Sequence, residues 1–414
     1  MIRTLRSVAR FRRFEPNRAK RRLSRAASVA DLRELAQRRL PAGVFDYIDG
    51  AAEDELTMER NAAAFDQWEF VPRVLRDVSE LDTSVELLGR RHPLPFALAP
   101  TGFTRIVCPD GELAVARAAA RKGIAYSLST LSTRSIEEIR EVSDGPLWFQ
   151  LYFWRDRGLV AEWLQRAADC DYEALLVAVD TPVFGRRERD VRRGFTLPPT
   201  LGPDTVLDGL RRPGWTWSLL RSEPITFANL TGVQGYDGNS ALGLAEFAHN
   251  QFNQELSWDD LDWLRERWNG KLVLKGVQSV ADAQMATDQG VDGIILSNHG
   301  GRQLDGAPPI LELVPQVADA VGGDIDVICD GGVRRGSHVA MAMALGADAV
   351  MFGRPYLYAL AATGEPGVGH LIDQFTEDLT RTLALLGIPK ASDLTPASVR
   401  QRGHWWSIKE QPQA

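Results

Sequence analysis

The segment that ends in His299 and Arg302 combines two side chains suited to acid–base chemistry. His299 follows the apolar run 293–296, and two glycines separate it from Arg302. An unperturbed imidazole titrates near neutral pH and can accept a proton, while a guanidinium can bind a carboxylate through two hydrogen bonds. Asp180 ends another apolar run and could orient the imidazole and stabilise its cation. The set predicts proton abstraction from a substrate that carries a carboxylate.

Lys275 ends the apolar run 271–274. A lysine at this place could be a fixed cation that stabilises developing negative charge. Two alternatives are a Schiff-base lysine and an ordinary surface lysine at the rim of the fold.

Two segments pair glycines with arginines. Asp330, Gly331, Gly332 and Arg334 lie in DGGVRRG (330–336), and Gly353 precedes Arg354. Glycine lets backbone N–H groups approach a phosphate closely, and the N-terminus of a following helix favours an anion. We predict a phosphate site there; the alternative is a pair of tight turns.

Eight short apolar runs organise the chain, and helix-like stretches follow most of them. This alternation predicts an α/β protein, a (β/α)₈ TIM barrel, whose polar strand ends converge on one face. The runs are 96–101, 125–130, 147–152, 175–180, 271–276, 293–299, 327–332 and 349–354.

The gap of 96 residues between the starts of the fourth and fifth runs predicts a long insertion, 187–256, after strand 4. Residues 1–28 hold ten Lys or Arg and one acid, which predicts a disordered basic tail. Ser28 and Asp31 predict the cap of a helix over 32–40, the start of an N-terminal helical extension. The expected domains are therefore this tail, a barrel over 29–386 and a C-terminal tail over 387–414.

The segments SNHGGRQLD (297–305) and DGGVRRG (330–336) resemble the FMN-dependent L-2-hydroxy acid oxidase and dehydrogenase family, which includes glycolate oxidase and the respiratory L-lactate dehydrogenases. The resemblance runs from about residue 32 to 386. It is strongest toward the actinobacterial L-lactate dehydrogenases.

The resemblance implies roles for individual residues. His299 would be the catalytic base, supported by Asp180, and Lys275 would stabilise reduced flavin. The substrate would be held by Tyr47, Tyr152, Arg187 and Arg302, with Leu131 above it. The FMN would contact Pro100, Thr101, Gly102, Ser129, Gln150, Lys275, Ser297, Asp330, Gly331, Gly332, Arg334, Gly353 and Arg354.

Two positions depart from the family pattern. Ala178 stands where the family often has a threonine that bonds the flavin, so we expect slightly altered flavin electronics. Leu131 stands where glycolate oxidase has a tryptophan, which disfavours glycolate and leaves room for a methyl group or a somewhat larger side chain. Tyr47 and Tyr152 could donate hydroxyl hydrogen bonds to a substrate, but the residues alone favour core packing for each. No metal-ligand spacing is present, and we expect no metal.

The expected reaction is oxidation of an L-2-hydroxy acid, L-lactate foremost, to a 2-oxo acid. Electrons would pass to quinone or another respiratory acceptor. The alternatives are an oxidase that uses O₂ and makes H₂O₂, a dehydrogenase for a larger acid such as mandelate, and a non-catalytic flavin-binding protein.

The charge pattern and the insertion predict the cellular location of the protein. The segment 211–221 combines paired tryptophans with flanking arginines, which suits a membrane interface; a loop packed on the barrel is the alternative. No apolar run reaches the length of a membrane span. With three scattered cysteines, we expect a cytoplasmic protein, peripheral on the inner face of the membrane. We expect no nucleic acid partner, and the resemblance implies a homotetramer.

Overall fold

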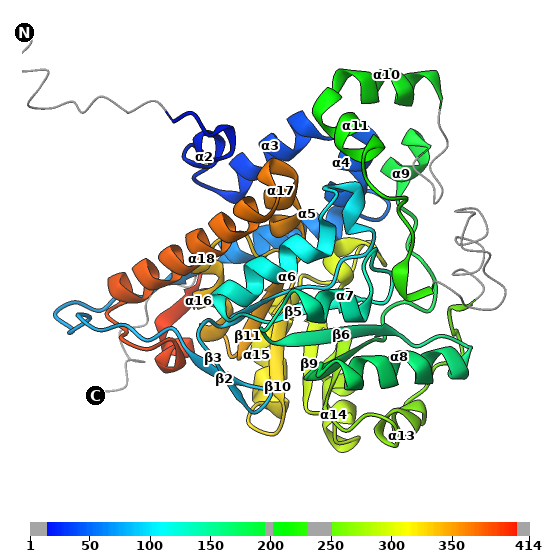
Figure 1. The fold of residues 1–414 in the computed structure, drawn as a ribbon. Coiled ribbons are helices and arrows are strands. Elements are labelled where there is room, and N and C mark those ends of the chain that lie inside the picture. The colour runs from blue at the N-terminus through cyan, green and yellow to red at the C-terminus, as the bar shows by residue number, and fades with distance from the viewer. Residues whose placement is uncertain (1–14, 195–201, 231–250, 404–414) are drawn as a thin grey trace, which may run out of the picture.

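The computed structural model describes residues 15–194, 202–230 and 251–403. The predicted eight strands form a closed parallel barrel, drawn in Figure 1 with its helices outside. Each strand pairs with the next along the chain, and β11 closes the ring by pairing with β4. The strands are β4 (Phe96–Leu98), β5 (Tyr126–Ser129), β6 (Leu147–Tyr152), β7 (Ala174–Ala178), β8 (Lys271–Val277), β9 (Gly293–Ser297), β10 (Asp326–Asp330) and β11 (Ala349–Phe352).

Side chains alternate between the two faces of these strands, as barrel geometry requires. Inward-facing Trp148, Leu176, Val273, Ile295 and Ile328 form a cluster of their own that fills the barrel. The hairpin of β2 (Val85–Leu87) and β3 (Arg90–His92) adds Leu87 to this cluster. The interior is a packed core, so any ligand must bind at a mouth of the barrel.

The outer helices follow the strands as predicted and bury the outward faces of the barrel. Ser135 forms a capping box at the start of α7, and the side chains of Asp156 and Ser279 cap α8 and α14. The helices are α6 (Gly111–Lys122), α7 (Ile136–Glu141), α8 (Arg157–Asp169), α13 (Asp260–Arg265), α14 (Val280–Asp288), α15 (Ile310–Val321), α16 (Gly336–Ala344), α17 (Arg354–Thr363) and α18 (Glu365–Leu386).

The N-terminal extension contains α2 (Arg18–Leu23), α3 (Val29–Arg39), α4 (Ala42–Asp49) and α5 (Leu56–Ala63). Ser28 caps α3 by accepting from the N–H of Asp31, as predicted. The prediction of a disordered tail up to residue 28 is wrong for residues 15–28. Leu23 and Ala26 are buried, and the Ala26 carbonyl accepts a hydrogen bond from Gln374 of α18. The tail's remaining residues, 1–14, lie outside the described ranges.

The C-terminal segment likewise is not a free tail from residue 387. Ala391 and Val399 are buried, and β12 (Val399–Gln401) pairs antiparallel with β1 (Trp68–Phe70). The segment therefore ties the end of the barrel back to the N-terminal extension. Residues 404–414 lie outside the described ranges.

The insertion after β7 carries α9 (Glu188–Arg193), α10 (Pro203–Arg211) and α11 (Pro213–Leu220), with α10 and α11 at the top of Figure 1. Residues 222–230, which we call the strap, run from α11 across the loops that follow β4 and β5. The Ala228 N–H donates to the Ser132 carbonyl, and Asn229 accepts from the N–H of Ile136. The insertion is thus bound to the face of the barrel where the strands end.

Candidate active site

A cleft at the carboxyl ends of the strands gathers most of the predicted site residues. It encloses about 1160 Å³ of empty space including its open mouth, enough for a cofactor and a small substrate. Asp180, Gln150 and Ser297 lie directly behind the lining and bond to residues that form it. The predicted residues that line the cleft are Tyr47, Pro100, Thr101, Gly102, Ser129, Leu131, Tyr152, Arg187, Lys275, His299, Arg302, Asp330, Gly331, Gly332, Arg334, Gly353 and Arg354.

His299 and Asp180 form the predicted pair at the ends of β9 and β7. His299 Nδ1 lies 3.2 Å from Asp180 Oδ2, and the His299 N–H donates to Ser297 Oγ. Burial acts to raise the pKa of Asp180, but His299 and Lys275 outweigh it and hold this pKa below its ordinary value. Because Nδ1 faces the carboxylate, Nε2 is the ring atom available to accept a substrate proton.

Glycine 276 makes room for this pair. Its φ is +108°, and a Cβ there would lie 2.5 Å from Cγ of Asp180. Any side chain at Gly276 would therefore displace the carboxylate that orients His299.

Arg302 is half-buried between α4 and the cleft. Its Nη1 donates to the carbonyls of Tyr47 and Gly50, and its guanidinium lies 5.3 Å from the centre of the Tyr47 ring. Burial and the nearby Arg187 lower the pKa of Arg302 to about 9, so it remains charged at neutral pH. Within the described residues, Nε of Arg187 is buried and has no hydrogen-bond partner. Two adjacent cations with donor capacity to spare suit a bound carboxylate.

Lys275 is not a surface lysine, since it is only 3% exposed. Its Nζ donates to Ser297 Oγ at 3.1 Å and pairs with Asp330 at 3.2 Å, while Ser297 Oγ donates to the same carboxylate at 2.9 Å. These contacts fix a buried positive charge at the end of β8. A fixed cation is the interpretation that this geometry favours over a Schiff-base lysine.

The part of the cleft lined by the loops after β10 and β11 has the properties of an anion site. Gly331 and Gly332 line the cleft. Gly332 has a φ of +75°, and a Cβ there would meet the Asn61 carbonyl at 2.0 Å, so only glycine fits this close approach of the loop to α5. Arg354 donates to the carbonyls of Asp49, Gly50 and Gly300, which hold its side chain in place at the first turn of α17. The loop leads into α16, whose N-terminus adds favourable dipole.

An unsatisfied donor tests whether the cleft fits FMN. Gln150 Oε1 accepts from Ser129 Oγ at 2.9 Å, but Nε2 of Gln150 is buried and has no partner among the described residues. A buried donor without a partner costs about 1–3 kcal/mol, which a ligand carbonyl would recover. With Lys275 nearby and the anion site at the other end, the cleft fits a flat carbonyl-bearing ring joined to a phosphate.

Asp49, which the sequence interpretation passed over, fixes the end of α4. Its carboxylate accepts from Arg33 at 2.5 and 2.7 Å, from Arg189 at 2.9 Å and from the Tyr358 hydroxyl at 2.7 Å. The Asp49 and Gly50 carbonyls in turn position Arg354 and Arg302. Asp49 therefore acts on the site through the α4 backbone.

Four phenylalanines of the cleft were also missed by the sequence interpretation: Phe103, Phe184, Phe227 and Phe352. Phe184 and Phe227 come from the long connection after β7, far in sequence from the other strand ends. Phe103 lies two residues beyond Thr101 and could have been included from its position alone. Phe227 has no signal in its neighbouring sequence, because only the path of the strap brings it to the cleft.

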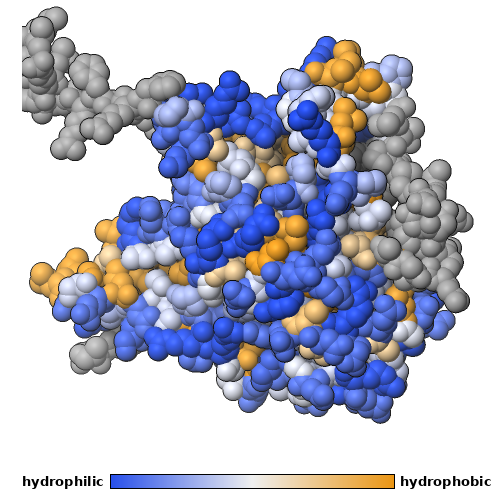
Figure 2. Space-filling model, in the orientation of Figure 1, coloured by the Kyte–Doolittle hydropathy of each residue, from blue (hydrophilic) through white to orange (hydrophobic). Residues whose placement is uncertain are grey.

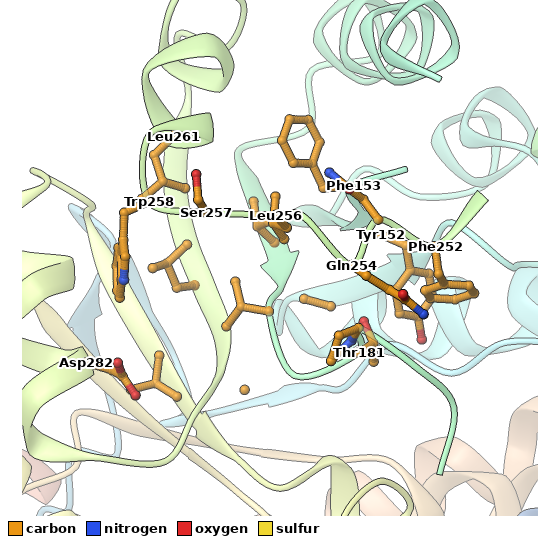
Figure 3. Close-up of a pocket in the computed structure, with 18 residues that line it drawn as sticks. Tyr152, Phe153, Thr181, Phe252, Gln254, Leu256, Ser257, Trp258, Leu261 and Asp282 are labelled. Carbon is orange, nitrogen blue, oxygen red and sulfur yellow. The ribbon is translucent and has the colours of Figure 1, made fainter. Parts of the chain in front are cut away.

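A second cavity lies behind Tyr152, between β7, β8 and residues 252–261 (Figure 3). Tyr152 lines both cavities, and its ring packs edge-on against Phe252 with centroids 5.4 Å apart. Burial and the nearby Asp180 raise the pKa of Tyr152. Its hydroxyl therefore stays protonated and can donate a hydrogen bond.

Comparison with known proteins gives consistent matches over almost the whole chain. The model of a family described as FMN-dependent dehydrogenase matches residues 36–401. An L-lactate dehydrogenase of Caulobacter sp. is 43% identical over 87% of this chain and 95% of its own length. An (S)-mandelate dehydrogenase of Pseudomonas putida is 40% identical over 91% of this chain and 94% of its own. A crystal structure of the monotopic membrane protein (S)-mandelate dehydrogenase has a TM-score of 0.87 at 40% identity and covers 90% of this chain and 99% of that one.

Proposed function

Because the chain belongs to the FMN-dependent dehydrogenase family, we propose that it oxidises an L-2-hydroxy acid, L-lactate foremost, to the 2-oxo acid. The observation that carries the proposal is the convergence of the His299–Asp180 pair, Arg302 and Lys275 on one cleft. Relatives named L-lactate dehydrogenase support the choice of substrate. Leu131 and the apolar cleft wall agree with a small apolar side chain.

The residues of the cleft divide the work on the substrate. Arg302 and Arg187 bind the carboxylate, and Tyr47 and Tyr152 donate hydrogen bonds to its oxygens or to the hydroxyl. His299 takes the hydroxyl proton at Nε2. Asp180 stabilises the resulting imidazolium through Nδ1, and its lowered pKa keeps it ionised for this purpose.

FMN, when bound, supplies the acceptor for the α-hydrogen and its two electrons. Gln150, Ser129 and the backbone of residues 100–102 would hold its ring. Gly331, Gly332, Arg334, Gly353 and Arg354 would hold its phosphate. Lys275 would supply a buried positive charge to the bound cofactor, which would favour the gain of negative charge there.

We also propose that the protein acts at a membrane surface and passes its electrons to quinone. Val206, Leu207 and Leu210 of α10 and Trp217 and Leu220 of α11 are exposed. Figure 2 shows an apolar patch at its top, where α10 lies. We call this surface the apolar hairpin. Within the described ranges no helix is long and apolar enough to cross a bilayer.

Basic residues lie next to the apolar hairpin. Arg18 and Arg22 of α2 line one cavity together with Trp215 and Ser218 of α11. Apolar side chains beside a basic surface suit contact with anionic lipid. A structural relative that is a monotopic membrane protein supports the same arrangement.

One anaerobic spectrum tests the reaction. The purified holoprotein receives L-lactate without oxygen, and the flavin absorbance is followed; it is expected to bleach. The reduced sample is then split between air and a soluble quinone. Fast recovery with quinone and slow recovery in air would support the dehydrogenase, whereas fast recovery in air with peroxide would establish an oxidase. Bleaching by mandelate but not lactate would move the substrate to a larger acid.

The homotetramer also remains a proposal, supported by the family resemblance. Size-exclusion chromatography with light scattering measures it directly. A mass of one subunit would contradict it.

A further inference from the structure

The strap is held by the loops after β4 and β5 through an unusually buried arginine. Arg105 is 4% exposed. Its Nη2 donates to the Glu223 carbonyl at 2.7 Å and its Nη1 to the Pro224 carbonyl at 3.2 Å. The Arg105 N–H donates to Thr133 Oγ1, which itself donates to the buried carboxylate of Glu112. Buried hydrogen bonds to a charged donor are strong, so Arg105 fixes the strap relative to both strand ends.

Phe227 is the strap residue that this anchoring brings to the cleft. It is 5% exposed and stacks on Phe103, with ring centroids 5.5 Å apart and 27° between the planes. Phe103 in turn meets the edge of Tyr47 at 6.3 Å. All three rings line the cleft, with Leu131 beside them. A continuous aromatic wall therefore starts at a substrate-binding tyrosine and ends on the insertion.

Phe103 pays a conformational cost to take its place in this wall. Its φ is +57°, in the left-handed region that non-glycine residues rarely adopt. Its N–H donates to the Leu131 carbonyl at 3.0 Å, which holds it there. Such strain persists where the surroundings fix it, and it is concentrated at functional sites.

We propose that Phe227 determines substrate specificity by limiting the length of the side chain on the hydroxy acid, and that Arg105 is the positioning residue that sets this wall. The inference rests on the proposed oxidation of a 2-hydroxy acid. The wall is apolar, so it takes alkyl or aryl groups and excludes a second carboxylate. An insertion far in sequence from the catalytic histidine thereby selects the substrate.

The test is the ratio of kcat/KM for L-2-hydroxyhexanoate to kcat/KM for L-lactate. Phe227→Ala is expected to raise this ratio about tenfold, because the removed ring frees space for several methylenes. Phe227→Trp is expected to lower it. Arg105→Lys retains the charge but cannot donate to the Glu223 and Pro224 carbonyls with the same geometry. This variant is expected to raise the ratio less than Phe227→Ala does. The double variant is expected to match Phe227→Ala alone, since both changes act on the same wall.

Ile225→Ala is the matched control. Ile225 is a half-buried strap residue that does not line the cleft, so its truncation is expected to leave the ratio within about twofold. An unchanged ratio in Phe227→Ala, or an equal shift in Ile225→Ala, would overturn the inference. If Phe227→Ala does not retain flavin, the milder Phe227→Leu and Phe227→Trp decide it by the sign of their shifts.

The wild-type spectrum separates this inference from the proposed function. If lactate does not bleach the flavin but longer acids do, L-lactate as substrate fails. The ratio is then measured between L-2-hydroxybutanoate and L-2-hydroxyhexanoate, with the same expected directions. If no hydroxy acid bleaches the flavin, the proposed function and the inference fail together.

Discussion

The mouth of the barrel and the insertion above it are built on opposite principles. At the mouth, the side chains of Asp180, Lys275 and Ser297 are buried and joined by hydrogen bonds or ion pairs to the ends of other strands. On the apolar hairpin, Leu210 is 66% and Leu220 is 74% exposed. Polar groups are buried where chemistry needs fixed charges, and apolar groups are exposed where a surface needs a partner. The strap joins the two regions, so the insertion extends from the exposed apolar hairpin to the cleft.

The largest expected effect lies at the mouth. His299→Gln retains the size of the side chain but removes the proposed base, so flavin reduction by L-lactate is expected to slow about 10³-fold. Stopped-flow absorbance of the holoprotein measures it. The bound-flavin spectrum of the variant is the control, and near-normal reduction would contradict the role of His299.

A stability effect is expected where α4 supports the mouth. Burial acts to raise the pKa of Asp49, but Arg33, Tyr358 and Arg189 together hold it below its ordinary value. Asp49→Asn removes the negative charge that Arg33 and Arg189 face. The change is expected to lower the free energy of unfolding by about 3 kcal/mol.

The direction of the Asp49 pKa shift predicts how this stability effect changes with pH. Because the folded-state pKa of Asp49 is lowered, its contribution is fully present above the ordinary carboxyl value and is lost as pH falls through the lowered value. Urea unfolding at pH 7 and below pH 4 measures the free energy of unfolding of both proteins. The difference between wild type and variant should be smaller at the acid pH. A constant gap would mean that the charge is not its source.

The insertion should respond differently from the mouth. Leu210→Ser with Leu220→Ser removes two exposed apolar side chains and is expected to weaken binding to anionic vesicles about tenfold. Flavin reduction by lactate should not change. Sedimentation with vesicles measures the first effect; equal sedimentation of both proteins would separate the apolar hairpin from any membrane role.

Deletion of the basic N-terminal residues tests the same contact with anionic lipid. Since α2 packs on the barrel through Leu23, removal of the basic segment should stop before Glu15. Deleting residues 2–14 is expected to weaken vesicle binding in proportion to the basic charges lost, by about 1 kcal/mol each at most. Equal binding in low and high salt would contradict an electrostatic contribution.

The smallest expected effect is at Ala178 on β7. Ala178→Thr adds a hydroxyl next to Lys275, its partner residue on β8, and one hydrogen bond is worth about 1 kcal/mol. The reduction potential of the flavin should shift slightly, with turnover changed only a few-fold. Potentiometric titration checks this, and a loss of bound flavin would show that the site does not tolerate the hydroxyl.

The sequence was most informative about the barrel. Each strand is an apolar run that ends in polar residues, so local pattern alone places His299, Lys275 and Asp330 at a common mouth. Parallel topology then brings these ends together without further information. The glycine-rich loops were readable for the same reason, since Gly331 and Gly332 carry their conformational role in their residue type.

The remainder depended on contacts between distant segments. Composition suggested a disordered start, yet Leu23 and Ala26 are buried by packing of α2 on the barrel helices. β12 forms only because β1 is available to pair with it. Arg105 binds the strap across more than a hundred residues of sequence through the carbonyls of Glu223 and Pro224, and backbone carbonyls have no sequence signature.

The seam between β11 and β4 has a consequence for synthesis. The two strands that close the ring are about 250 residues apart in the chain. A ribosome adds roughly 5–20 residues each second, so the first strand waits many seconds for the partner that completes its edge. Until then β4 exposes an unpaired edge that can associate with other chains. Expression of this protein should therefore gain from slower growth or added chaperones, and fragments that end before residue 349 should accumulate as aggregates.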